Sequence, residues 1–189
     1  MKKQLFILTL VLVLSACQSQ PIEPTNDAKP ACDPTEDCQT SSNQDYTKNF
    51  TEISMDQALD LFKNGESGIV FFGFKDCPWC KEAAPSLEKV AKEQDKEIYY
   101  VKTRSDEDHE LLYDDSQREE LSQYIGQWMD ENEDEENKLW LYVPLVIHIK
   151  NGTATGGHEG TIEGHDAKER KMNEEEKEEL MEIYSDLIQ

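Results

Sequence analysis

The sequence predicts an α/β fold in which helices flank a central sheet. A short, continuous apolar run at 69–74 is rich in β-branched and aromatic residues, which is typical of a strand buried on both faces, and residues 97–103, with Ile98-Tyr99-Tyr100-Val101 at their centre, predict a second buried strand. Segments with apolar residues at three- and four-residue spacing, typical of amphipathic helices, precede, separate and follow these runs. The predicted order is helix, strand, helix, strand, helix, β-hairpin and helix, beginning near Phe50.

The first two helices carry recognisable start signals. Ser54 and Gln57 have the spacing of a capping box, which predicts a helix over 54–64. A second helix is expected from Pro78 to about residue 94, because proline is well tolerated in a first helical turn. Pro85 lies inside this second segment and predicts a kink.

The C-terminal part is expected to form a hairpin and a last helix. Residues 141–149 form an apolar strand pattern, and Asn151-Gly152 directly after it is a strong signal for a two-residue hairpin turn. Residues from 153 onward should then pair back on that strand. The final helix, over about 174–187, begins with glutamates, which the helix dipole favours at that end.

Residues from about 105 to 138 form a strongly acidic insertion. Apolar residues at helical spacing predict one amphipathic helix within it: Leu121, Tyr124, Ile125, Trp128 and Met129. The run at 130–136 is interpreted as a solvated acidic loop. Calcium binding is the alternative, but the glycine-punctuated spacing of a calcium-binding loop is missing from the sequence.

The composition indicates one folded domain with a segment that does not pack. Hydrophobic residues make up 37% of the 189 residues, below the roughly 45–50% usual in globular domains. Residues 17–49 contain four prolines among polar residues, and only Ile22 and Tyr46 are sizeable apolar side chains. This stretch is therefore expected to be a flexible tether, with the folded domain at 50–189.

The first residues have the regions of an export signal. Lys2 and Lys3 precede an apolar run at 5–14, and Leu14-Ser15-Ala16-Cys17 ends it with small residues before a cysteine. This pattern resembles the lipobox of bacterial lipoproteins, which implies removal of 1–16 and lipid attachment to Cys17. A transmembrane helix is the alternative, but the apolar run has only half of the roughly 20 residues that a span needs. An outward-facing lipoprotein of the bacterial cell membrane is expected.

The formal net charge of −22 excludes some partners. Binding to nucleic acid needs clustered Lys and Arg to neutralise phosphates, so no nucleic-acid partner is expected. Adsorption to an anionic lipid surface is disfavoured for the same electrostatic reason. Contact with the membrane should therefore depend on the lipid on Cys17.

The other four cysteines form two pairs by position. In an exported protein, paired cysteines are interpreted first as disulfides. Cys32 and Cys38 could close a small local disulfide in the tether, with weak metal binding as the alternative. Cys77 and Cys80 stand where a strand meets a helix, and the helix N-terminus stabilises a thiolate on the first cysteine. Cys77 is thus expected to be the attacking nucleophile and Cys80 the shielded resolving thiol.

The order of elements around Cys77-Pro-Trp-Cys80 resembles the thioredoxin fold over roughly 52–189. The resemblance implies a mixed central sheet and a redox role for the two cysteines. It also implies that Pro144 is a cis-proline facing the disulfide and that the backbone of Val143 contacts the substrate.

Two positions depart from the thioredoxin pattern. Phe71 stands where thioredoxins have a buried aspartate that assists proton transfer to the resolving thiol. Asp76 replaces the tryptophan directly before the nucleophile, and a carboxylate there opposes thiolate formation. We expect the helix terminus to outweigh Asp76, because a solvated carboxylate is screened.

A closer resemblance covers residues 74–92, Phe-Lys-Asp-Cys-Pro-Trp-Cys-Lys-Glu-Ala-Ala-Pro-Ser-Leu-Glu-Lys-Val-Ala-Lys, followed by Ile98-Tyr99-Tyr100. This segment is similar to the bacteriocin-transport accessory group of thioredoxin-like proteins.

The sequence therefore predicts a monomeric, extracytoplasmic thiol-disulfide oxidoreductase that acts on exported proteins without a cofactor. The alternative is an accessory or binding module for a secreted peptide, with a non-catalytic Cys-x-x-Cys. A structural zinc site would need two further ligands. His158 and His165 are interpreted instead as part of the loop after the hairpin, and His148 as a structural residue of its strand.

Overall fold

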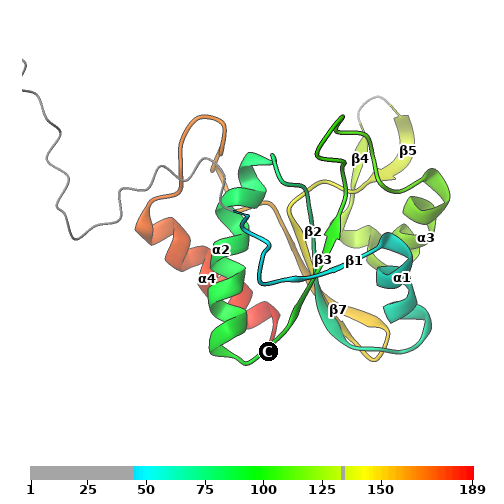
Figure 1. The fold of residues 1–189 in the computed structure, drawn as a ribbon, viewed down its shortest axis with the longest axis horizontal. Helices are drawn as coiled ribbons and strands as arrows, with labels where there is room; N and C mark the ends of the chain where they lie inside the picture. The colour runs from blue at the N-terminus through cyan, green and yellow to red at the C-terminus, as the bar shows by residue number, and fades with distance from the viewer. Residues whose placement is uncertain (1–44, 133–134) are drawn as a thin grey trace, which may run out of the picture. The chain divides into compact units, whose positions relative to one another are not determined.

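The fold is a five-stranded mixed sheet covered by helices on both faces (Figure 1), in a computed structural model that describes residues 45–132 and 135–189. The strand order is β1-β3-β2-β6-β7. The strands are β1 Thr51–Ile53, β2 Gly68–Gly73, β3 Ile98–Lys102, β6 Leu145–Lys150 and β7 Thr153–Glu159. The helices are α1 Met55–Lys63, α2 Pro78–Glu93, α3 Asp115–Ile125 and α4 Glu174–Leu187.

The pairing of the strands gives a thioredoxin-like topology. Strand β3 pairs in parallel with β1 and β2, whereas β6 is antiparallel to β2 and β7. Helices α2 and α4 pack together on one face of the sheet, and α1 and α3 contact each other on the other. The predicted α/β class with a mixed sheet is confirmed.

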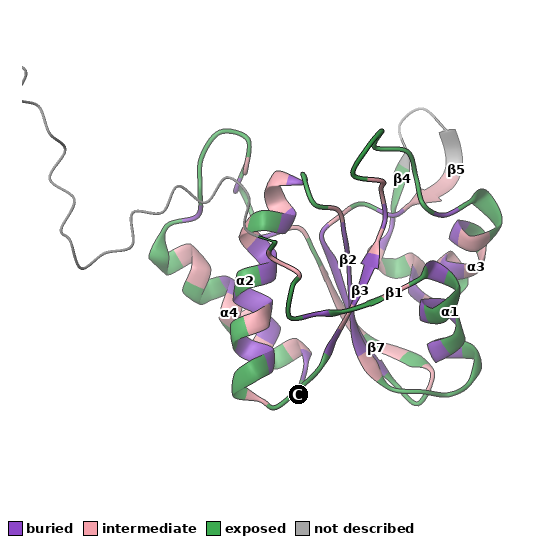
Figure 2. Ribbon diagram, viewed as in Figure 1, coloured by how far each residue is buried: buried purple, intermediate pink, exposed green. Residues whose placement is uncertain are grey.

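Strand β2 reads as a continuous apolar run because it is buried on both faces (Figure 2). Ile69 and Phe71 belong to the core under α2 and α4, and Val70 and Phe72 to the core under α1 and α3. Successive side chains of a strand point to opposite faces, so each face receives alternate residues. The strand is thereby fixed in the centre of the sheet, and the cysteine pair follows its end.

Several predicted boundaries and signals are confirmed. The side chains of Ser54 and Gln57 form the expected capping box at α1. Asn151 and Gly152 have φ values of 50° and 71°, the left-handed conformation at both central residues that the two-residue hairpin turn requires. The predicted strand at 141–149 is shorter than expected, since β6 begins only after Pro144, which has no N–H for the ladder.

The acidic insertion differs from the expectation. Its helix α3 is present, followed by the 3-10 helix η1 (Gly126–Trp128), but the predicted solvated loop is a hairpin of β4 (Asp130–Asn132) and β5 (Glu135–Trp140). The guanidinium of Arg118, only 2% exposed, explains how the hairpin is held. It donates to the Leu139 carbonyl at 2.6 Å and lies 5.6 Å from the centre of the Trp140 ring.

The folded domain includes residues that the sequence assigned to the tether. Residues 45–49 form a turn, and Tyr46 packs against the core under α2 and α4. Strand β1, which the sequence analysis did not predict, follows at once. The expected start of the domain at residue 50 is therefore too late. Cys17, Cys32 and Cys38 lie outside the described residues.

Candidate active site

Cys77 is placed at the N-terminus of α2 by the turn that follows β2. It is the N-cap residue, with extended backbone angles, and Pro78 occupies the first helical position. The Cys80 backbone N–H donates to the Cys77 sulfur at 3.4 Å, so the sulfur caps its own helix. Both cysteines are free thiols in the structure.

The pKa of Cys77 is lowered to about 7. The largest cause is a hydrogen bond from the Cys80 thiol, which favours the Cys77 thiolate. The backbone N–H groups of Cys80 and Trp79 and the positive charge of Lys81 also lower this pKa, whereas burial raises it. The Asp76 carboxylate lies 3.6 Å from the Lys81 ammonium, and about half of each side chain is exposed. Lys81 thus neutralises the neighbour that was expected to oppose the thiolate.

We expect the alkylation rate of Cys77 to rise with pH around a midpoint near 7. Only the thiolate reacts, so about half of Cys77 is reactive at pH 7, whereas a thiol with the ordinary pKa of about 8.5 is a few per cent ionised. Rates measured with iodoacetamide on the reduced protein, with mass spectrometry to locate the label, test this. A midpoint above 8 contradicts the geometry at the helix terminus.

Cys80 has the opposite environment. It is 0% exposed, and burial together with the neighbouring Cys77 sulfur raises its pKa well above the ordinary value. Hydrogen bonds from the Phe74 backbone and the Tyr46 hydroxyl act in the other direction and stabilise its thiolate. Phe71, at the position where the sequence lacked the expected aspartate, is itself 0% exposed and fills the space with an apolar ring.

Tyr46 is the site residue that sequence reasoning missed. Its hydroxyl donates to the Phe74 carbonyl, and it also lies within hydrogen-bond reach of the Cys80 sulfur, to which its one proton can turn when Cys80 is a thiolate. Burial raises the pKa of the phenol. The same Phe74 carbonyl accepts the Cys77 backbone N–H at 3.1 Å. A large aromatic residue in an otherwise polar, proline-rich stretch was the available signal.

We expect Tyr46→Phe to raise the pKa of Cys80 and to slow the reduction of the Cys77–Cys80 disulfide severalfold. Attack by an outside thiolate on the Cys77 sulfur expels Cys80, and a thiol of higher pKa is a poorer leaving group. Stopped-flow reduction by dithiothreitol measures this rate. Tyr99→Phe, whose side chain packs on the other face of the sheet, is the matched control. Unchanged kinetics in Tyr46→Phe would show that the hydroxyl only supports the turn.

The loop before β6 lies against the nucleophile. The Val143–Pro144 peptide is cis, as the resemblance implied, and Pro144 is buried. The Cys77 thiol faces the Val143 carbonyl at 3.7 Å. Val143, Pro144 and both cysteines are therefore brought together from two elements that are far apart in the chain.

A groove of about 470 Å³ opens beside Cys77. The start of α2, the connection between β3 and α3, the segment between β5 and β6, and the connection between β7 and α4 surround it. Its lining includes the aromatic, apolar and basic side chains Phe74, Trp79, Arg104, Leu111, Tyr142 and Lys168. Cys77 is only 3% exposed, yet it lines this groove, whereas Cys80 does not.

The histidines serve the packing of the C-terminal part. His148 Nδ1 pairs with the Leu187 carbonyl at 2.8 Å, and burial lowers the pKa of His148. His165 bridges the Thr161 hydroxyl at 2.8 Å and the Arg170 carbonyl at 3.1 Å. Within residues 45–132 and 135–189, no group of three or more His, Cys, Asp or Glu side chains is arranged to hold a metal ion.

Comparison with known proteins finds a lipid attachment site at the N-terminus and solved structures of similar fold. Residues 1–18 match the model of the prokaryotic membrane lipoprotein lipid attachment site. No curated protein matches the chain. Among solved structures, oxidised thioredoxin from Plasmodium falciparum is 18% identical over 72% of this chain and 98% of its own, with a TM-score of 0.38. Thioredoxin f2 from Chlamydomonas reinhardtii is 16% identical over 59% and 83%, with a TM-score of 0.36.

The match at residues 1–18 has a direct consequence for the location of the protein. In the part of the chain that the structure describes, no helix has the length and apolar character needed to cross a membrane. The lipid attachment site within residues 1–18 indicates an anchor of a different kind, a covalently attached lipid. The chain therefore combines a prokaryotic membrane lipoprotein lipid attachment site, within residues 1–18, with a domain of thioredoxin-like fold.

Proposed function

We propose that the protein is an extracytoplasmic thiol-disulfide oxidoreductase that acts on exported proteins through Cys77 and Cys80. One observation carries the proposal: the pKa of Cys77 is lowered to about 7 beside an open groove, whereas the pKa of Cys80 is raised in the core. A merely structural disulfide needs no such asymmetry. Thiol-disulfide exchange needs this asymmetry, because one sulfur attacks the client and the other must stay protonated until it resolves the mixed disulfide.

The exchange follows from this arrangement. The Cys77 thiolate attacks one sulfur of a client disulfide; a bond forms between them, the client S–S bond breaks, and the second client sulfur leaves as a thiolate. Cys80 then loses its proton and attacks the Cys77 sulfur, which releases the first client sulfur. The client disulfide is reduced by two electrons, and the Cys77/Cys80 dithiol is oxidised by two. The same steps in reverse oxidise a client dithiol.

The reduction potential of the Cys77/Cys80 couple tests the proposal. The protein is equilibrated with defined ratios of reduced and oxidised glutathione, and the dithiol fraction is measured by alkylation and mass. A potential within roughly −270 to −120 mV, the range of thioredoxin-fold oxidoreductases, supports exchange with protein clients. A disulfide that stays oxidised far below that range is structural and contradicts the proposal.

A second function, an accessory or binding module for a secreted peptide, has one observation in its favour. The acidic insertion forms a hairpin whose end borders the groove, with Trp140 and Leu141 among the lining residues. Residues 74–92 also resemble the bacteriocin-transport accessory group. Peptide binding by the Cys77→Ser variant tests this second function. If the variant still binds exported peptides in the groove, and the biological effect of that binding is unchanged, the protein is an accessory module.

Export is proposed together with the lipid. Residues 17–44 would connect the lipid on Cys17 with the domain on the outer face of the membrane, and a local Cys32–Cys38 disulfide would lie within this tether.

We expect Cys17→Ala to release the protein from membranes. The thioether-linked lipid is the proposed anchor, and a net charge of −22 repels the chain from anionic lipids. Fractionation of cells that express the variant, with intact Cys17 as the control, measures the membrane-bound share. Retention of the variant without lipid modification would contradict an anchor at Cys17.

A further inference from the structure

The charges of the groove beside Cys77 are opposite to those of the chain. The sequence has 41 Asp and Glu against 19 Lys and Arg. Among the described residues that line the groove, however, none is acidic, and two are basic, Arg104 and Lys168. In so acidic a chain, an opening whose described lining has two cations and no carboxylate differs from the average surface.

The two cations lie over aromatic rings. Arg104 lies 5.7 Å from the centre of the Phe74 ring and donates to the His109 carbonyl at 2.9 Å. Lys168 lies 5.3 Å from the centre of the Trp79 ring. Neither has a carboxylate at ion-pair distance among the described residues, whereas several other basic side chains, such as Lys63, Lys81 and Lys177, do.

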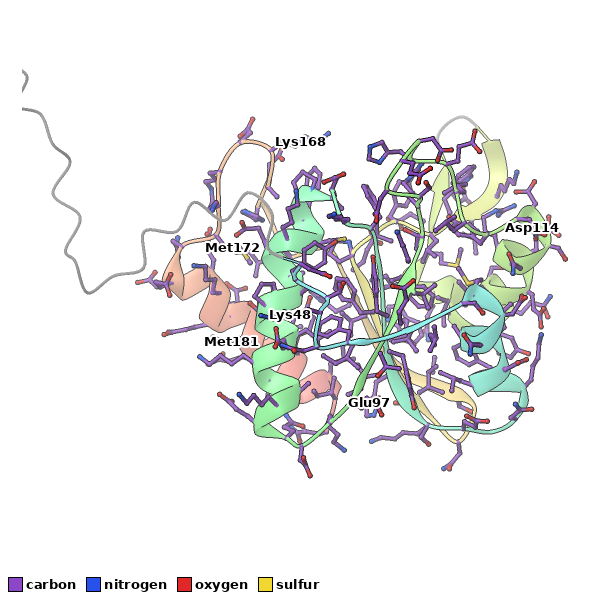
Figure 3. All side chains as sticks on the ribbon, viewed as in Figure 1. Lys48, Glu97, Asp114, Lys168, Met172 and Met181 are labelled. Carbon is purple, nitrogen blue, oxygen red and sulfur yellow. The ribbon has the colours of Figure 1, made fainter. Side chains whose placement is uncertain are left out.

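The cations stand on either side of the nucleophile. Phe74 precedes Cys77 by three residues, and Trp79 follows it by two. The connection between β3 and α3, which carries Arg104, and the connection between β7 and α4, which carries Lys168, lie on opposite sides of the start of α2 (Figures 1 and 3). The two connections that carry the cations therefore flank the start of α2, and both cations line the groove that Cys77 lines.

The same groove carries the exposed apolar surface of the domain. Leu111, Leu112 and Tyr142 are the exposed large hydrophobic residues in the described part of the chain, with Tyr142 44% exposed. Leu111 and Tyr142 line the groove, and Leu112 is adjacent in sequence. Apolar side chains gathered at one opening mark a binding surface.

We propose that this groove selects client segments in which a carboxylate lies within a few residues of the reacting cysteine, next to an apolar side chain. The inference rests on the proposed function and names its substrate class. The carboxylate would pair with Arg104 or Lys168, and the apolar side chain would contact Leu111 or Tyr142. Clients that are acidic over their whole surface are disfavoured, because the charge of −22 repels them at longer range.

Peptides of identical composition separate this local preference from overall charge. Each peptide contains one cysteine, one leucine beside that cysteine, one glutamate and one lysine. The cysteine is activated as a mixed disulfide with 2-thiopyridine, which is a neutral leaving group. In the first peptide the glutamate is adjacent to the cysteine and the lysine is six residues away; in the second the two are exchanged. Release of thiopyridone by the reduced protein gives the rate, divided by the rate with 2-mercaptoethanol to remove intrinsic reactivity.

We expect the glutamate-adjacent peptide to react on the order of three- to tenfold faster, the effect of one or two partly exposed ion pairs. The double variant with Arg104→Ala and Lys168→Ala should bring the ratio close to one, and Lys89→Ala, an exposed lysine on α2, should leave it unchanged. Equal rates for both peptides, or a faster lysine-adjacent peptide, would overturn the charge preference while exchange itself stands. No release above the level of Cys77→Ser from either peptide would overturn the proposed function, and the preference with it.

Discussion

Replacing Cys80 with alanine should trap Cys77 in a mixed disulfide with its client. Of the two cysteines, Cys77 is the one that lines the groove and has the lowered pKa, so the variant should still attack a client disulfide. The sulfur that would release the client is missing, so the adduct should accumulate toward one client per protein, whereas the natural protein resolves it. Non-reducing electrophoresis and intact mass, with an oxidised client peptide in excess, measure the adduct.

The pH of the trapping experiment matters, because the substitution also changes the nucleophile. The Cys80 thiol is the largest cause of the lowered Cys77 pKa. In Cys80→Ala that pKa should therefore rise, and attack at pH 7 should slow severalfold. At about pH 9.5, one unit above the ordinary thiol pKa of about 8.5, most of Cys77 should be a thiolate in both proteins, and the adduct reports on resolution alone. Cys77→Ser is the control and should form no adduct; an adduct through Cys80 in that variant would reverse the two roles.

The placement of Cys77 and Cys80 could be predicted because it depends on local sequence. A buried strand, a short turn and a proline at the first helical position determine where the helix begins, and the helix terminus determines which sulfur is activated. The pairing of Val143 with Cys77 is not local. It was predicted only through the resemblance to thioredoxins, since residue spacing does not show which distant loop faces a helix terminus.

The acidic hairpin and Tyr46 could not be predicted for two different reasons. The run at 130–136 has the charge pattern of a solvated loop, and the contacts that Arg118 makes from a separate helix with the Leu139 carbonyl and the Trp140 ring are not visible in that pattern. Tyr46 lies in a polar stretch whose average composition favours disorder. One aromatic ring packed against a core outweighs that average, and composition does not reveal where such a ring finds its contacts.

Phe71→Ala should destabilise the domain by about 3–5 kcal/mol, the usual cost of removing a buried phenylalanine. The Phe71 ring meets the Phe50 ring edge to face at 5.7 Å. It also fills the space beside the resolving thiol, because the ring and the Cys80 sulfur both come within 3.0 Å of the point where a Cβ on Gly73 would lie. Urea unfolding measures the loss, and Phe71→Leu, which retains most of the volume, should cost less than half as much.

The cavity left by alanine also relieves the burial that raises the Cys80 pKa, so that pKa should fall, as alkylation of Cys80 against pH would show. A loss below about 1 kcal/mol with an unchanged Cys80 pKa would mean that this ring neither supports the core nor insulates the thiol.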